Sequence, residues 1–377
     1  MRTGEPRFTF GIEEEYHLVD LESRDLAPAP PELMAACEAA LGGQVSPEFL
    51  RSQIEVGTRV MTSFGEARAE LGTLRTTIAE LAGAHGLAPL AAGTHPFGRG
   101  DVIPPTDRDR YRALVDDLQH VVRRLATCGM HVHVGLADDD LRIDIMNQMR
   151  YFVPHLLALS TSSPFWQGDN TGLKCYRLSV LDELPRTGLP GRFSSWAEYA
   201  GTIDVLVRAR VIENASKVWW DIRPSARFQT LELRVADSCT RLEDALAVAA
   251  VFVCLCRMLY RLRRNNQSWR TYPLFLLEEN RWRAQRYGAK ATLFDFGKGE
   301  LVPMADLAEE IIAITAEDAA ALGCEAEVAR IRTIVAEGTS ADRQVACFDA
   351  AQAAGKAPAA ALQAVVDMLV GETREKL

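Results

Sequence analysis

The segment that most constrains how this chain can fold is the run FTFGIEEEYH at positions 8–17. With the two-residue period of a β-strand, its aromatic and aliphatic side chains share one face, and its polar side chains share the other. Glu13 and Glu15 then lie about 7 Å apart on the polar face, because a strand rises roughly 3.3 Å per residue. Two such carboxylates repel each other unless solvent screens them or a cation lies between them. The run alone leaves both alternatives open, a solvated acidic face or a cation site.

Glu14 lies between these two residues, on the apolar side of the same predicted strand. A carboxylate on that side needs a partner of opposite charge or a place at the edge of the strand. We therefore expect an ion pair or an edge position for Glu14, and we do not count it among the candidate metal ligands.

Four further predicted strands also gather acidic, imidazole or guanidinium groups on one face. Their polar positions are Glu55 in the first, His131 and His133 in the second, Asp221 and Arg223 in the third, and Thr230, Glu232 and Arg234 in the fourth. Lysine, which is common on solvated strand faces, is almost absent from these segments. If all five strands belong to one sheet with helices on its apolar face, these groups converge on the opposite face.

A concave surface of this composition suits phosphate chemistry. Carboxylates and imidazole bind hard divalent cations that bridge phosphates, and a carboxylate-rich site favours Mg²⁺ or Mn²⁺ over Zn²⁺. Arginine stabilises the charge on a transferring phosphoryl group. Taken singly, His133 is expected to be a structural or supporting residue rather than a ligand. The pair His131 and His133 on one strand face also leaves a zinc hydrolase open.

Between these strands the sequence predicts helices. Helical spacing covers residues 30–41, 64–84, 107–126, 138–160, 194–212 and 241–263, and the chain beyond residue 299 is helical with no strand signal. Antiparallel strands with helices on one side make an α+β arrangement. Residues 163–192, with several Gly and Pro, are expected to form an extended loop of the active-site type.

Composition narrows the classes of partner. The net charge of −9 argues against a nucleic-acid or anionic-membrane partner, because either needs a basic surface. The apolar run at 245–256 is shorter than the roughly 20 residues of a membrane span and predicts a buried helix. The first six residues lack the apolar core of a secretory signal. Eight scattered cysteines without a Cys-x-x-Cys pair indicate reduced, mostly buried thiols, so we expect a cytoplasmic protein.

Six ordered motifs carry a resemblance to a known family. They are GIExE at 11–15, GTHPF at 93–97, HVHVG at 131–135, RYFVPH at 150–155, WDIRPS at 220–225 and TLELRV at 230–235. Together they resemble the carboxylate–amine ligase family, also called type 2 glutamate–cysteine ligases. The resemblance implies the glutamine-synthetase-like fold, a curved, mostly antiparallel β-sheet funnel with helices packed on its outer face. It also implies one catalytic domain over residues 1–377, helical in its C-terminal portion from about residue 300.

The same resemblance implies an ATP-dependent ligase that uses Mg²⁺ or Mn²⁺. In such enzymes the γ-phosphoryl group of ATP passes to the side-chain carboxylate of glutamate, and the amino group of cysteine attacks the acyl phosphate to give γ-glutamylcysteine. The implied ligands of the metal and the nucleotide are Glu13, Glu15, Glu55, His131 and Glu232. Arg234 is implied to face the phosphoryl group, with Arg223 as a second phosphate or carboxylate contact, Glu48 as a further acidic ligand, and Thr94 and His95 at the border of the substrate.

The partners expected from the resemblance are small molecules, namely ATP, glutamate and cysteine or another amine, with residues 168–192 lining the amine pocket. A homo-oligomer, with a dimer as the first expectation, follows by analogy only. Two other functions stay open on the same fold. One is a phosphotransferase that joins no amine, and the other is a non-catalytic protein that binds a metal or a nucleotide.

Overall fold

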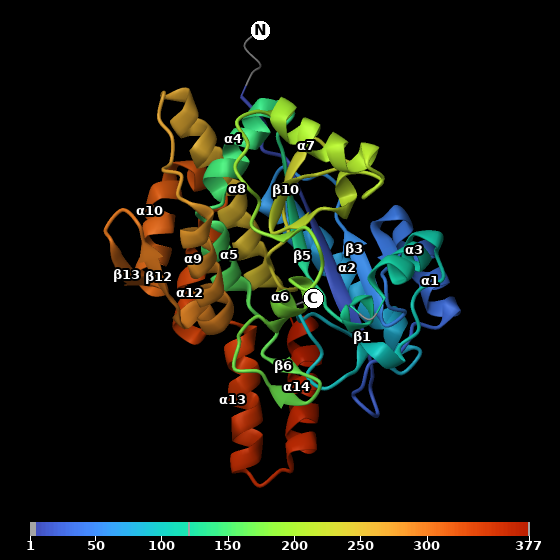
Figure 1. The fold of residues 1–377 in the computed structure, drawn as a ribbon. Coiled ribbons are helices and arrows are strands. Elements are labelled where there is room, and N and C mark those ends of the chain that lie inside the picture. The colour runs from blue at the N-terminus through green and yellow to red at the C-terminus, as the bar shows by residue number, and fades with distance from the viewer. Residues whose placement is uncertain (1–4, 120, 376–377) are drawn as a thin grey trace.

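In the computed structural model, which describes residues 5–119 and 121–375, the chain is built around one seven-stranded sheet (Figure 1). Its path runs β10-β11-β5-β1-β3-β2, and β4 pairs with β1 beyond the end of β5. All the pairings in this sheet are antiparallel, which confirms the predicted α+β class, and the sheet stays open. The bounds are β1 Phe10–Asp20, β2 Val45–Pro47, β3 Gln53–Gly57, β4 Leu87–Leu90, β5 Met130–Gly135, β10 Ile222–Pro224 and β11 Thr230–Leu233.

The register of the sheet gathers the polar residues. Glu15 of β1 lies opposite Glu55 of β3, and Glu13 lies opposite His131 of β5. One strand further along, His133 lies opposite Glu232 of β11. Because residues directly opposite each other in an antiparallel pair point to the same face, these side chains all project from one side of the sheet.

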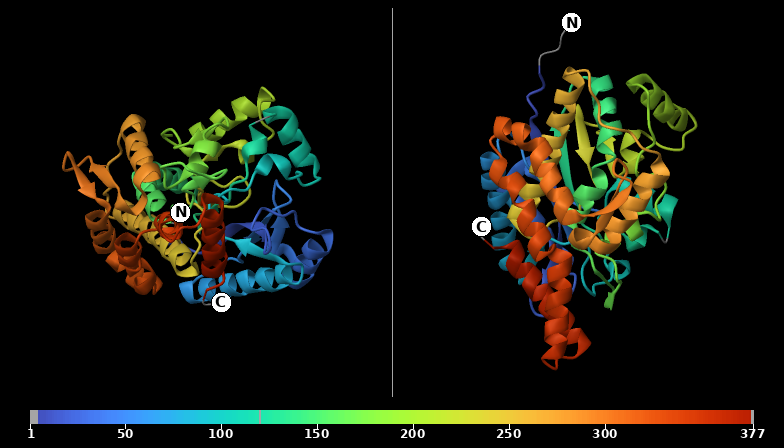
Figure 2. Two further views of the ribbon diagram at one scale, coloured as in Figure 1. Left: turned by 90° about the horizontal axis from the view of Figure 1, so that it is seen from below. Right: turned by 90° about the vertical axis from the view of Figure 1, so that its left-hand side faces the viewer.

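Helices cover the other side of the sheet. The first is α2, Phe64–Gly83, which begins with a capping box between Ser63 and Glu66. The second is α8, Leu242–Arg264, which packs against α2 and β5 in the core (Figures 1 and 2). By length and composition α8 passes for a membrane span, but 78% of its apolar window is buried inside the protein, as expected of a core helix.

Glu14 forms the ion pair expected for its side of β1. Its carboxylate accepts from Arg75 of α2 at 2.6 and 2.9 Å, and both side chains are almost completely buried. The Tyr16 hydroxyl donates to the same carboxylate at 2.5 Å, and Arg75 also donates to the backbone carbonyls of Cys239 and Thr240. This pair therefore joins the central strand to α2 and to the segment that enters α8.

The predicted helix over 138–160 is in fact two helices. α4 spans Asp139–Met149 and α5 spans Val153–Ser160. Pro154 has no N–H for the carbonyl of Arg150, and its ring clashes with that carbonyl in a continuous helix. The break falls at this point, and Pro154 instead occupies the first turn of α5, where it is tolerated.

The helical C-terminal portion begins slightly later than predicted, because residues 300–303 form a strand. β12, Thr292–Asp295, and β13, Glu300–Pro303, make an antiparallel hairpin around the turn at Gly297 to Gly299. Five helices follow, namely α10 Met304–Leu322, α11 Glu325–Ala329, α12 Ile331–Glu337, α13 Ser340–Ala353 and α14 Pro358–Thr373. α13 and α14 form a hairpin that extends away from the rest of the molecule, and α14 also packs on β4 (Figures 1 and 2).

The remaining elements surround the polar face or the outer helices. They are α1 Pro31–Leu41, α3 Asp109–Leu118, α6 Tyr176–Leu181, α7 Trp196–Arg208, α9 Leu274–Tyr287, and the short strands β6 Phe165–Trp166, β7 Asp169–Asn170, β8 Thr187–Gly188 and β9 Trp219–Trp220. The helix predicted over 107–126 is thus shorter than expected and ends at Leu118.

Candidate active site

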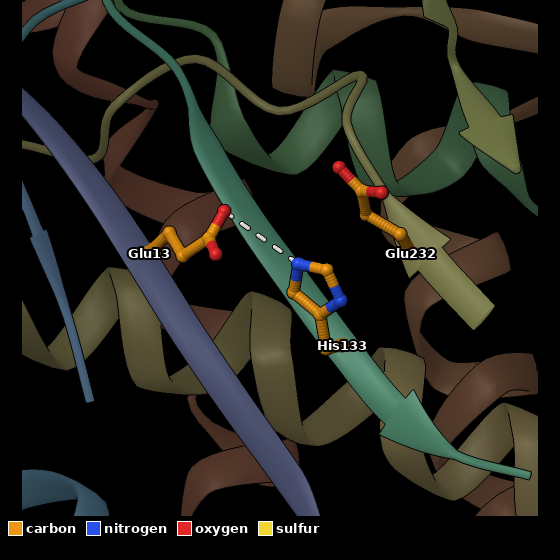
Figure 3. A group of neighbouring side chains, drawn as sticks. All are labelled: Glu13, His133 and Glu232. Atoms are coloured by element: carbon orange, nitrogen blue, oxygen red, sulfur yellow. Dashed lines mark ion pairs between the residues drawn. The ribbon is translucent and has the colours of Figure 1, made fainter. Parts of the chain in front are cut away.

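Two groups of metal-ligating side chains lie side by side on the polar face. In one group, Glu13, His133 and Glu232 bring a ligand atom each to within 4.8 Å of one another (Figure 3). In the other group, Glu15, Glu48 and Glu55 do the same. Both sets consist of the carboxylate and imidazole donors that divalent cations bind.

His133 takes a more central position than the sequence predicted for it. Its Nε2 lies 3.5 Å from Glu13 Oε2, and its Nδ1 lies 2.9 Å from the Thr230 hydroxyl (Figure 3). That contact fixes the ring so that Nε2 points toward the carboxylates. The structure therefore places His133, and not only His131, among the candidate ligands.

His131 lies between the two groups. Its Nδ1 is 3.2 Å from Glu13 Oε2, and its Nε2 is 4.0 Å from Glu15 Oε1. The Nε2 atoms of His131 and His133 are both buried and without a hydrogen-bond partner among the described residues. A buried donor atom without a partner costs free energy, so both nitrogens are suited to receive a cation.

The three-carboxylate group concentrates negative charge. Burial, followed by the charges of Glu48 and Glu13, raises the pKa of Glu55 well above its ordinary value. Burial also raises the pKa of Glu15, although His131 opposes the shift. Carboxylates this close cannot all be ionised without a compensating charge, which a proton or a divalent cation supplies. Glu48, the weaker expectation from the sequence, lies inside this group.

The predicted arginines lie beside Glu232. Its carboxylate accepts from Arg234 at 2.5 Å and from Arg223 at 2.9 Å. Burial favours a higher pKa for Glu232, but the charges of Arg234 and Arg223 outweigh it and hold the pKa below its ordinary value. For Glu13, burial is likewise outweighed, here by hydrogen bonds from the two histidines, so its pKa is also lowered. Both carboxylates are therefore anionic at neutral pH.

Arg177 of α6 is a candidate site residue that sequence reasoning missed. Its guanidinium donates to the backbone carbonyls of Val235 and Arg234 at 3.3 and 3.2 Å and lines the cavity that holds Glu15. A Cβ on Gly129 would come within 2.3 Å of its Nη2 atom, so only glycine fits there. The only signal in the sequence was that Arg177 lies in the expected active-site loop.

Asp237 lies behind Arg177 and is completely buried. Its carboxylate is 3.8 Å from Arg177 Nη1 and accepts from the Ser162 amide and the Ser163 hydroxyl, both at 2.7 Å. Burial raises the pKa of Asp237, while Arg177 and these hydrogen bonds oppose the shift. Asp237 and its partners thus hold the guanidinium from the side away from the cavity.

Thr94 and His95 are not brought to the site. The Thr94 hydroxyl donates to the carbonyl of Phe165 at 2.7 Å. His95 Nδ1 accepts from the backbone amides of Phe97 and Gly98, and its Nε2 lies 2.9 Å from the carbonyl of Arg24. Both side chains are buried, and neither lines the cavities beside the acidic residues. They stabilise the loop that follows β4.

Two cavities flank the acidic residues. The inner cavity, of about 340 Å³, is lined by Glu15, Glu48, His131, Arg177, Arg223 and Arg234 together with apolar residues. The outer cavity, of about 440 Å³, is lined by Glu13, Glu55, His133 and Thr230 and by the exposed pair Arg227 and Phe228. The Phe228 ring stands edge-on to His133, with ring centroids 5.9 Å apart, and Arg227 lies 5.0 Å from its centroid.

The open antiparallel sheet and the acidic groups on its polar face define a glutamine-synthetase-like ligase. The family model described as glutamate–cysteine ligase family 2 (GCS2) matches residues 9–364, and the chain belongs to this family of carbon–nitrogen ligases. A protein from Rhodospirillum rubrum, provisionally named glutamate–cysteine ligase 2, is 59% identical over 374 residues, which cover 98% of this chain and 96% of that one. A protein of the same name from Jannaschia sp. is 56% identical over 363 residues, 96% of each chain.

Solved structures show the same fold at low sequence identity. A glutamate–cysteine ligase from Francisella tularensis, crystallised with AMP, matches with a TM-score of 0.68 at 12% identity over 98% of this chain and 90% of that one. A bifunctional glutathione synthetase from Pasteurella multocida matches with a TM-score of 0.69 at 16% identity over 98% of this chain. The match spans about half of that longer enzyme, 53% of its chain. The fold implied by the sequence motifs is thereby confirmed.

Proposed function

We propose that this protein is an ATP- and Mg²⁺-dependent ligase that joins the γ-carboxylate of glutamate to the amino group of cysteine. The observation that carries the proposal is the placement of two groups of candidate cation ligands within one polar face, directly beside three arginines. Phosphoryl transfer needs this combination, because positioning and charge stabilisation supply most of its catalysis. Family membership supports the same reaction.

The proposed ligands are the predicted set of Glu13, Glu15, Glu55, His131 and Glu232, extended by Glu48 and His133. Mg²⁺ or Mn²⁺ bound there would neutralise the triphosphate and the developing charge on the γ-phosphoryl group. Arg234 points between Glu232 and His131 and is placed to contact that group. The cluster of three carboxylates supports a divalent cation, since its mutual repulsion is otherwise uncompensated.

The nucleotide is proposed to occupy the outer cavity. Phe228 is 48% exposed there and offers an aromatic face, with the Arg227 guanidinium beside it. A purine base stacks on such a ring, and cation–π contact from arginine adds to the stacking. From this cavity the triphosphate reaches Glu13, His133 and Glu55 directly.

Glutamate is proposed to occupy the inner cavity. Arg177 and Arg223 are suited to bind its α-carboxylate, because guanidinium forms paired hydrogen bonds with carboxylates. Its γ-carboxylate then lies toward Arg234 and the acidic groups, where it accepts the phosphoryl group. Residues 1–377 act as one catalytic domain in this proposal, located in the cytoplasm, and a homo-oligomer is expected.

The test is ADP release and product mass with ATP, Mg²⁺, glutamate and cysteine. The expected product contains a new amide bond, and Arg234→Ala lowers kcat by about 10²- to 10³-fold. Arg332→Ala, at a half-exposed surface ion pair with Glu309, is the matched control and leaves kcat unchanged. A phosphorylated product without an amide would indicate the phosphotransferase. Unchanged turnover in Arg234→Ala would indicate that the site does not perform the reaction.

A further inference from the structure

The inner cavity changes character with distance from the acidic groups. One wall is formed by Phe49, which directly follows Glu48, and by Tyr111 of α3. Their ring centroids are 5.6 Å apart in an edge-to-face arrangement, and the Tyr111 hydroxyl donates to the carbonyl of Pro47. Since that hydroxyl is directed to the backbone of β2, the wall presents aromatic carbon to the cavity.

The facing wall comes from α6 and the loop after it. Leu178 directly follows Arg177, and Leu181 and Leu184 continue the same apolar surface. Trp219, paired in β9 with Thr187 of β8, lines the cavity beside them. These residues belong to the segment 168–192, which the sequence predicted to line the amine pocket, and to the strand that pairs with it.

The two walls make an apolar end that neither expected amino acid needs. Glutamate carries two carboxylates and an ammonium group, which the charged end of the cavity matches. Cysteine has a side chain of one methylene and a thiol, which fills little of an aromatic and leucine-lined space. An apolar cavity surface that stays open to water is unfavourable, and such surfaces commonly mark ligand sites.

We propose that this apolar end is the amine subsite and that it accepts amino acids with aliphatic or aromatic side chains larger than that of cysteine. The inference rests on the proposed ligase function. In the joining step the lone pair of the amine nitrogen attacks the γ-carbonyl carbon of the acyl phosphate. The C–N bond forms, the C–O bond to phosphorus-bound oxygen breaks, inorganic phosphate leaves, and the nitrogen loses a proton to solvent.

The first experiment compares amines at fixed ATP, Mg²⁺ and glutamate with the full chain. Alanine, cysteine, leucine and phenylalanine are supplied singly, and both ADP and amide product are measured. Leucine or phenylalanine is expected to give kcat/KM at least about tenfold above alanine, since each methylene in a matching apolar pocket contributes a factor of about 10 or more. Amide formation with cysteine and alanine but not with leucine or phenylalanine would overturn the inference and leave the ligase function intact. No amide with any amine would overturn both.

The second experiment changes the wall itself. Leu181→Asn, at a partly buried position of the lining, keeps the size of the side chain and makes it polar. KM for leucine should rise about tenfold, with KM for ATP and glutamate and the cysteine reaction unchanged. Leu181→Met should restore leucine, and Leu301→Asn, on the half-exposed side of β13, is the matched control. Equal losses with leucine and cysteine would show a purely structural role and contradict the assignment.

Discussion

At the scale of single residues, Glu14 and Glu15 show how one step along a strand changes the role of a carboxylate. Glu14 faces the helices and is neutralised by Arg75 in the core. Glu15 faces the opposite side, where it accepts from the Gly129 amide at 2.6 Å and approaches Glu48 and Glu55. The alternation of the pleat separates a structural ion pair from a candidate metal site.

Removing Arg75 should destabilise the protein severely. Arg75→Ala leaves the Glu14 carboxylate buried without a partner, and such losses cost about 3–5 kcal/mol of unfolding free energy. Urea denaturation measures the difference. Arg59→Ala breaks an exposed ion pair with Glu70 and should cost less than about 1 kcal/mol. Equal effects of the two variants would contradict a special role for the buried pair.

Asp237 should act on glutamate through Arg177. Asp237→Asn keeps the shape of the side chain but removes the charge that faces the guanidinium, so KM for glutamate should rise about tenfold while KM for ATP stays unchanged. Steady-state kinetics with each substrate varied in turn separates the two. Asp367→Asn, at a surface pair with Arg24, is the control. A parallel loss of affinity for both substrates would indicate general disruption of the site.

Cation binding at the three-carboxylate group should weaken as the pH falls. Because burial and mutual repulsion raise the pKa of Glu55 and Glu15 in the metal-free protein, protons must leave before a divalent cation binds. Mg²⁺ should therefore raise Tm more at about pH 8 than at about pH 6, with affinity changing up to roughly tenfold per pH unit for each proton released. Glu55→Gln should abolish most of this dependence, and an unchanged dependence would place the cation elsewhere.

At the scale of elements, β1 organises the site because it is long enough to pair with three strands at once. Its first half lies between β3 and β5, which supply Glu55 and the two histidines, and its second half pairs with β4. A shift of one residue in either register would turn the polar side chains to the core. The loop that follows β4 is in turn held by His95, which bonds three backbone groups.

Buried neutral histidines should make these elements sensitive to acid. Burial lowers the pKa of His95 and of His155 in α5 to about 4 each. The unfolded chain, with histidine pKa near 6.5, then binds more protons than the folded chain, so stability is complete above about pH 6.5 and falls as the pH drops toward 4. Each histidine contributes up to about 3 kcal/mol to this loss.

Urea denaturation at several pH values measures the effect. His95→Gln should reduce the pH dependence, because the variant has no imidazole to protonate in the unfolded state. His85→Gln, at an exposed position, should leave the dependence unchanged. Identical pH profiles for the wild type and His95→Gln would contradict the assignment.

At the scale of the whole molecule, the sheet and most of its polar face could be predicted from the sequence because strand alternation is a local property. Glu13, Glu15, Glu55, His131, Glu232 and Arg234 all follow a period of two. Arg177 and Asp237 could not be found this way, since one lies on a short helix in an irregular segment and the other acts from behind it. Thr94 and His95 are polar residues in a family motif, but their hydrogen bonds close a loop, which only tertiary contacts reveal. The break at Pro154 was readable in principle and was missed.

The two cavities meet at the acidic residues, and no described residue lines both. Each ligand therefore has its own approach to the reacting centre, and the presence of one does not close the route of the other. The kinetic order of substrate addition should accordingly be random, with initial-rate lines that intersect when ATP and glutamate are varied together. A compulsory order would require a movement of the chain that joins the two approaches.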